Sequence, residues 1–235
     1  MEPRNEFFRE LATTVATSEN KDDLNFHGAP IFYSCPSKGD LDGYPADEET
    51  IVWTTSHLKA FLQQGAVQSK ARTVHLIAHS MGNRALTQAL AELGAPTNGT
   101  LRAHFREVIL AAPDVDPDIF KQLAGTFHKT ADRVTLYASS HDEALAASKR
   151  LHEFPRAGEA GQGLLVMQGI DTIDVSAVDT SFLGHSYSGD NASVISDIQR
   201  LLAQGFPPGH RACLSEALSA NLAYWIFVRT ACPAQ

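Results

Sequence analysis

The sequence contains little that would support a disulfide-rich, metal-binding or membrane-spanning protein. Its three cysteines, Cys35, Cys213 and Cys232, are odd in number and show no C-x-x-C spacing. That pattern excludes a disulfide framework and argues against a structural zinc site. It predicts three free thiols, which suit a reducing compartment. The longest apolar runs, such as residues 222–228, are too short to span a bilayer.

Positive charge and ligand motifs are also scarce. Lys and Arg number 19 against 27 Asp and Glu, and the net charge of −8 argues against a nucleic-acid groove. The acidic run from Asp114 resembles the start of a calcium loop, but Ile119 and Gly125 stand where glycine and glutamate are needed. Lys38 lacks the spacing of a phosphate loop. The first ten residues are too charged for a signal peptide, so the chain as written is predicted to be cytoplasmic, with no metal or cofactor.

Strand and helix patterns alternate along the chain. Apolar and β-branched runs predict strands at 29–33, 73–78, 107–111, 133–138, 164–166 and 172–175. Helical spacing predicts helices at 7–15, 47–64, 81–93, 117–123, 143–151 and 193–202. The alternation predicts one α/β domain over residues 1–235, with a mostly parallel sheet and helices on both faces. Residues 205–235 are predicted to be an irregular C-terminal extension.

The pentapeptide Ala78-His79-Ser80-Met81-Gly82 follows an apolar strand and precedes a helix. This arrangement is typical of a nucleophile elbow, in which a serine stands on a tight turn at the carboxyl end of a strand. The first position is usually glycine, but alanine is only one methyl group larger. The helix N-terminus makes the Met81 N–H a candidate oxyanion donor. The alternative is that Ser80 merely caps the helix.

A catalytic serine needs a histidine as base and a carboxylate that orients the histidine. In folds with a nucleophile elbow, the carboxylate follows the serine along the chain and the histidine comes last. Asp142 comes just after the strand at 133–138, although it could instead cap the next helix. Asp114 or Asp116 is the fallback acid. His185 lies in a loop after the last predicted strand, where catalytic histidines are favoured. The spacing alone does not decide between these roles.

Several motifs together resemble the α/β-hydrolase superfamily, and more closely a bacterial branch known only as a domain of unknown function. They are YSCPSKG at 33–39, HSMGNR at 79–84, APDVD at 112–116, YASSHD at 137–142, RAG at 156–158 and GHSY at 184–187. The resemblance implies a serine hydrolase with Ser80 as nucleophile, Asp142 as acid and His185 as base.

The resemblance also identifies a difference. Relatives carry a strand and a His-Gly-aromatic-Asn turn before the first helix, and that turn supplies a second oxyanion N–H. The chain therefore resembles an α/β hydrolase that lacks its N-terminal strands, and the exposed sheet edge would favour a homodimer. An upstream segment would leave a secreted or lipoprotein form open.

The predicted function is cleavage of a small-molecule carboxylic ester. The alternatives are acyl transfer with the same triad, and a weakly active or inactive binding or scaffold module.

Overall fold

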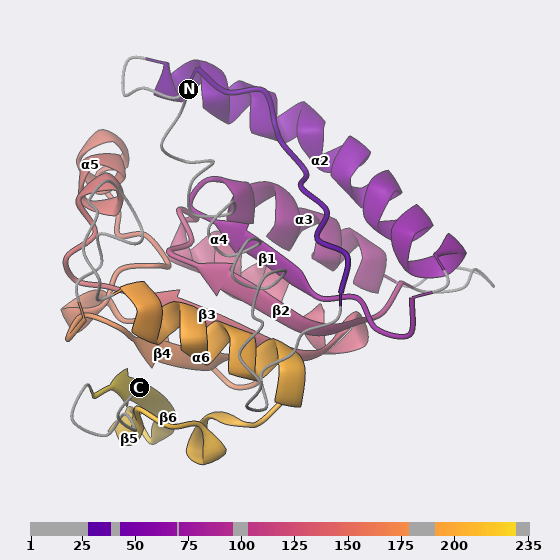
Figure 1. Cartoon of the computed structure of the whole chain (residues 1–235). Helices are drawn as coiled ribbons and strands as arrows, with labels where there is room; N and C mark the ends of the chain where they lie inside the picture. Colours follow the sequence, from indigo (N-terminus) through magenta and orange to yellow (C-terminus); the bar gives the residue numbers. More distant parts are fainter. Residues whose placement is uncertain (1–27, 39–42, 70, 96–102, 179–190, 229–235) are drawn as a thin grey trace.

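The computed structural model describes residues 28–38, 43–69, 71–95, 103–178 and 191–228. They form a six-stranded sheet in the order β1-β2-β3-β4-β6-β5 (Figure 1). Strands β1 to β4 and β6 are parallel, and β5 pairs antiparallel with β6 at one edge. The bounds are β1 Leu76–His79, β2 Phe105–Ala111, β3 Ala131–Ala138, β4 Asp171–Asp174, β5 Leu214–Ser219 and β6 Leu222–Phe227.

Helices cover both faces of the sheet, with α2, α3 and α4 on one side and α6 on the other (Figure 1). Along β2, Val108 and Leu110 pack with α3, whereas Ile109 and Ala111 pack with α6. Burial on both faces is typical of parallel sheets. The helices are α2 Tyr44–Gln68, α3 Gly82–Gly94, α4 Pro117–Ala124, α5 Glu143–His152 and α6 Asn191–Gln204, with 3-10 turns at η1 Phe127–Lys129, η2 Gly161–Gly163 and η4 Pro208–His210. The predicted fold class is confirmed.

The strand predicted at 29–33 is wrong. This segment is an irregular stretch with Ile31 74% and Phe32 57% exposed, and Tyr33 packs its ring on Phe61 of α2 at 5.3 Å between centroids. A strand requires a hydrogen-bonded neighbour, and within the described residues none pairs with this segment. The helix predicted at 7–15 lies outside the described residues.

The strand predicted at 164–166 is also wrong. Leu165 is buried because it packs into the core beside α3, and its carbonyl accepts a hydrogen bond from Thr172 Oγ1 at 2.8 Å. The apolar run therefore reflects core packing in a loop after η2, without strand pairing.

The prediction that residues 205–235 are irregular is contradicted by the β5–β6 hairpin. Ala220 and Asn221 have φ values of 48° and 65°, which suits a two-residue turn between antiparallel strands. Only Asn221 is a residue type that signals such a turn, so the hairpin was missed. The assignment of the whole chain to one domain stays a prediction.

The expected set of three free thiols is wrong. Cys35 is a free thiol, but Cys213 is disulfide-bonded. Cys232 lies outside the described residues. The thiol argument for a reducing compartment therefore fails. Among the described helices, none has the length and apolar character needed to cross a membrane.

Candidate functional site

Ser80 occupies the turn between β1, which ends at His79, and α3, which begins at Gly82. Its backbone is left-handed, with φ of 50°. This region is strained for a residue with a side chain, and such strain persists only where surrounding contacts enforce it. The N-cap of α3 is Met81, and no side chain makes a capping hydrogen bond there. Ser80 is therefore not a helix cap.

Four hydrogen bonds hold the Ser80 backbone in this conformation. Its N–H donates to the Ala111 carbonyl at 3.0 Å. Its carbonyl accepts from the Asn83 N–H at 3.1 Å, from Asn83 Nδ2 at 3.0 Å and from the Asp114 N–H at 3.3 Å. Asn83 Nδ2 also donates to the Ala111 carbonyl at 3.1 Å, and Asn83 is fully buried. The elbow is thus tied to the end of β2.

The small residues around Ser80 have different roles. Ala78 is buried in the core, so alanine fits at the first position of the pentapeptide. A Cβ at Gly82 would meet no atom within 4 Å. The turn therefore leaves room for a side chain at position 82.

The Met81 N–H lies at the start of α3 and has no hydrogen-bond acceptor within the described part of the chain. A helix N-terminus presents unpaired N–H groups and the positive end of the helix dipole. The geometry therefore makes this N–H available to an oxyanion. No second oxyanion donor is identified among the described residues.

Asp142 stands after β3, at the same carboxyl edge of the sheet as Ser80. It is the N-cap of α5, where its Oδ1 accepts from the Leu145 N–H at 2.9 Å, and it is 9% exposed. A carboxylate has two oxygens, so capping through Oδ1 is compatible with a second role. His185 lies outside the described residues.

The loop that carries Asp142 is tied to the end of β4. The Ser140 N–H donates to Ser176 Oγ at 2.9 Å, and His141 Nδ1 donates to the Ser176 carbonyl at 3.1 Å. Ser176 in turn donates its N–H to Asp174 Oδ1 at 2.9 Å. These contacts fix the Asp142 loop against the segment that precedes His185. Sequence patterns gave no signal for Ser176.

Asp114, the fallback acid, has its carboxylate fully engaged. Its Oδ1 accepts from Ser148 Oγ and from Arg156 Nε, both at 2.7 Å, and its Oδ2 accepts from the Tyr44 hydroxyl. Burial alone would raise the pKa of Asp114, but Arg84 and these hydrogen bonds hold it below the usual carboxyl value. Both carboxylate oxygens of Asp114 are thus already bound within the protein, which makes Asp114 a poorer candidate for orienting a histidine.

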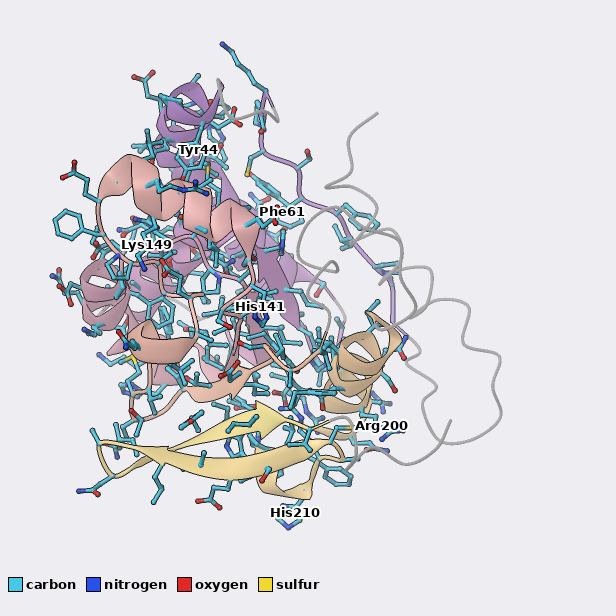
Figure 2. The ribbon with its side chains drawn as sticks, turned by 90° about the vertical axis from the view of Figure 1, so that its left-hand side faces the viewer. Tyr44, Phe61, His141, Lys149, Arg200 and His210 are labelled. Atoms are coloured by element: carbon cyan, nitrogen blue, oxygen red, sulfur yellow. The ribbon has the colours of Figure 1, made fainter. Side chains whose placement is uncertain are left out.

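Arg84 joins Asp114 to the helices around the elbow. Its Nε donates to the Asp114 carbonyl at 2.6 Å, and Nη1 pairs with Glu48 of α2. Glu48 also accepts from His152 Nε2 of α5 at 2.8 Å, taking this nitrogen as the donor. Figure 2 shows Tyr44 lying beside α5, and its hydroxyl is 2.9 Å from Ser148 Oγ. We call these seven residues, Tyr44, Glu48, Arg84, Asp114, Ser148, His152 and Arg156, the Asp114 network.

The Asp114 network braces the elbow directly, since the Asp114 N–H donates to the Ser80 carbonyl. It also fixes the first turn of α3 through Arg84. Sequence patterns suggested Asp114 as a fallback acid and as the start of a calcium loop, which was rejected, but gave no signal for its partners, which come from four separate segments. Within the described residues, no group of His, Cys, Asp and Glu has the arrangement of a metal site.

Comparison with known families agrees with this geometry. A family model described as an alpha/beta hydrolase of unknown function (DUF900) matches residues 5–204. The chain belongs to this family. The matched range includes Ser80, Asp142 and His185 and ends with α6, so the β5–β6 hairpin of this α/β hydrolase lies beyond it. No significant match was found among curated proteins or solved structures.

Proposed function

We propose that this α/β hydrolase cleaves a carboxylic ester, with Ser80 as nucleophile, His185 as base and Asp142 as acid. The left-handed backbone of Ser80, between β1 and α3, is the observation that supports this most. A serine that only capped a helix would have an extended backbone and would bond to the first turn. Strain at a partly exposed serine is expected where the hydroxyl must be presented to a substrate.

In the proposed reaction, Ser80 Oγ attacks the ester carbonyl carbon while His185 accepts the hydroxyl proton. The Met81 N–H stabilises the negative charge that forms on the carbonyl oxygen. The tetrahedral intermediate collapses, the carbon–oxygen bond to the alcohol breaks, and His185 gives its proton to the departing alkoxide. Water then attacks the acyl-serine, His185 takes its proton, and Ser80 leaves protonated as the carboxylic acid is released. Asp142 holds the imidazole in the tautomer this sequence needs.

The test is covalent labelling by a fluorophosphonate, together with hydrolysis of nitrophenyl acetate. Wild type should label, and both Ser80→Ala and His185→Ala should abolish labelling and lower turnover by roughly 10,000-fold or more. Ser140→Ala is the matched control, because Ser140 is an exposed serine at the same edge of the sheet. It should label like wild type.

Labelling that survives in Ser80→Ala would contradict the assignment of the nucleophile. If the folded wild type neither labels nor hydrolyses, a non-catalytic binding module is the better description. If it labels and yields an ester of an added alcohol in preference to free acid, the reaction is acyl transfer.

A further inference from the structure

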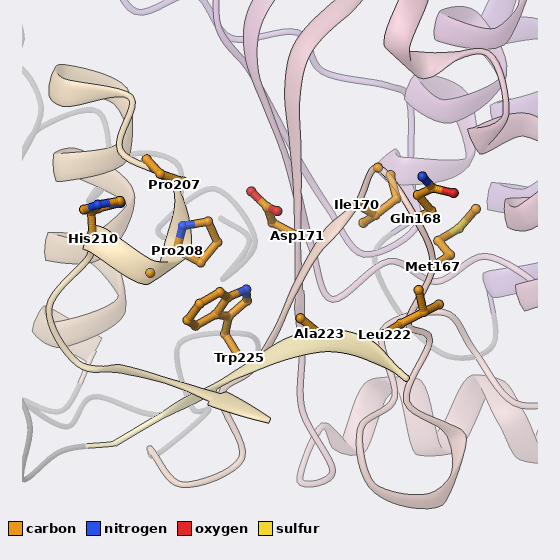
Figure 3. Close-up of a pocket in the computed structure, with 12 residues that line it drawn as sticks. Met167, Gln168, Ile170, Asp171, Pro207, Pro208, His210, Leu222, Ala223 and Trp225 are labelled. Carbon is orange, nitrogen blue, oxygen red and sulfur yellow. The ribbon is translucent and has the colours of Figure 1, made fainter. Parts of the chain in front are cut away.

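A pocket of about 390 Å³ lies at the amino ends of β4 and β6 (Figure 3). Ile170 and Asp171 border it at the start of β4, and Leu222 borders it at the start of β6. Because these strands run parallel to β1, the pocket stands at the edge of the sheet opposite to Ser80 and Asp142. It is therefore separate from the candidate catalytic site. Its volume falls in the range of small-molecule sites.

Rigid apolar groups make most of the wall. Pro207 and Pro208 stand next to the indole of Trp225, which rises from β6 (Figure 3). Gly209 lies so close to this ring that an added Cβ would be 3.2 Å from it. Glycine at position 209 therefore lets η4 close onto Trp225 and hold the indole in place.

Asp171 supplies the negative charge of the pocket. Figure 3 shows its carboxylate turned toward Pro207 and Pro208, above Trp225. Among the residues that line the pocket, it is the only acid, and His210 is the only other titratable side chain. Burial raises the pKa of Asp171, although Arg133 opposes this effect.

The Asp171 carboxylate contacts an arginine through only one of its two oxygens. Arg133 Nη1 is 3.3 Å from Asp171 Oδ2, but Arg133 Nε is also 3.5 Å from Glu107 Oε2. The Arg133 guanidinium thus lies between the carboxyl groups of Asp171 and Glu107. Arg211 also attracts the Asp171 carboxylate, but its Nε and Nη2 donate to Asp197. Asp171 Oδ1, by contrast, has no hydrogen-bond or ion-pair partner among the described residues.

We propose that this pocket binds an organic cation, a primary or quaternary ammonium with a compact apolar substituent. The ammonium pairs with Asp171 and lies against the indole of Trp225, since cations are attracted to aromatic faces. The substituent contacts the proline rings. An anionic ligand would face the Asp171 carboxylate, and the net charge of −8 favours the approach of cations.

The pocket lies only partly within the range that the family model matches, since its lining residues 167–171, Asp171 among them, fall inside residues 5–204. Pro207, Pro208, His210, Leu222 and Trp225 all follow residue 204, where the match ends. The site is formed where the C-terminal hairpin joins the hydrolase sheet. Because the pocket and Ser80 lie at opposite edges of the sheet, the proposal stands independently of the proposed ester cleavage.

The test uses the fluorescence of Trp225. The chain has two tryptophans, so Trp53→Phe leaves Trp225 as the single reporter. In this background, tetramethylammonium and butylammonium should change the fluorescence with saturation, and titration calorimetry on wild type should give the same affinity. Asp171→Asn should weaken binding about tenfold or more, because a desolvated charge pair is lost. Trp225→Leu should weaken it in the calorimetric assay.

Asp132→Asn is the matched control, because it removes the same charge from an exposed position on β3 and should leave binding unchanged. Neopentyl alcohol, a neutral analogue of tetramethylammonium, should bind at least tenfold more weakly. Circular dichroism confirms that each variant is folded. The proposal is overturned if no ammonium binds with saturation, if folded Asp171→Asn binds as wild type does, or if the neutral analogue binds equally well.

Discussion

Glu107 provides the sharpest test of the electrostatics of this fold. It is 3% exposed on β2, beneath α6, and its pairing with Arg133 is loose at 3.5 Å. Burial raises the pKa of Glu107 to about 7, and attraction by Arg133 and Arg106 compensates only in part. Ionised Glu107 should therefore destabilise the folded protein at neutral pH and above.

The magnitude follows from linkage between protonation and folding. Folded Glu107 holds its proton up to about pH 7, whereas the unfolded chain loses it near the usual value of 4.5. The stability is present below the unfolded pKa and is lost as pH rises through the folded pKa. Since one pKa unit is equivalent to about 1.4 kcal/mol, the loss between about pH 4.5 and pH 8 is about 3 kcal/mol.

Glu107→Gln removes this ionisation while keeping the shape of the neutral side chain. Urea unfolding of wild type and variant should be measured from about pH 5 to about pH 8. The difference between their unfolding free energies should shift by roughly 2–3 kcal/mol in favour of the variant as pH rises. Glu216→Gln, at an exposed position of β5, should show no such shift. A difference that stays constant with pH would refute the reasoning.

Three further substitutions test the site and its supports. Asp114→Asn should lower the free energy of unfolding, measured with urea, by about 3–5 kcal/mol, because it leaves the buried Arg156 without its carboxylate partner. The exposed Asp118→Asn should change this free energy by less than about 0.5 kcal/mol, and equal stabilities of the two variants would contradict the bracing role. Gly158→Ala should lower the free energy of unfolding by about 1–3 kcal/mol, because the added Cβ would lie 2.6 Å from the backbone of the loop between β2 and α4. Gly65→Ala, where an added Cβ meets no atom within 4 Å, should leave this free energy unchanged or raise it, and a Gly158→Ala variant as stable as wild type would contradict this packing. Asp142→Asn should reduce ester turnover by roughly 10,000-fold. The melting temperature should change little, since asparagine also caps helices, and unchanged turnover would mean that Asp142 serves only as the N-cap of α5.

The sequence was sufficient to predict those helices and strands that are defined by a local pattern of apolar residues. Alternating apolar runs and helical spacing located β1 to β4 and α2 to α6 within a few residues, because periodic burial defines these elements. The same patterns failed at 29–33 and 164–166, where apolar residues lie in loops. An apolar run indicates burial or a propensity for strand structure, but a strand forms only where a second strand, distant in sequence, lies beside it and pairs with it.

For the site, the sequence by itself determined that Ser80 stands between a strand and a helix and that Asp142 follows the next strand but one. It could not decide between Asp114 and Asp142 as the candidate acid, since that choice depends on which side chains surround each carboxylate. Only the tertiary structure brings Tyr44, Ser148 and Arg156 from separate segments onto Asp114. The positive φ of Ser80 is likewise enforced by β2 and its following loop. Sequence thus fixes the positions of these groups along the chain, while burial and long-range hydrogen bonding decide what each can do.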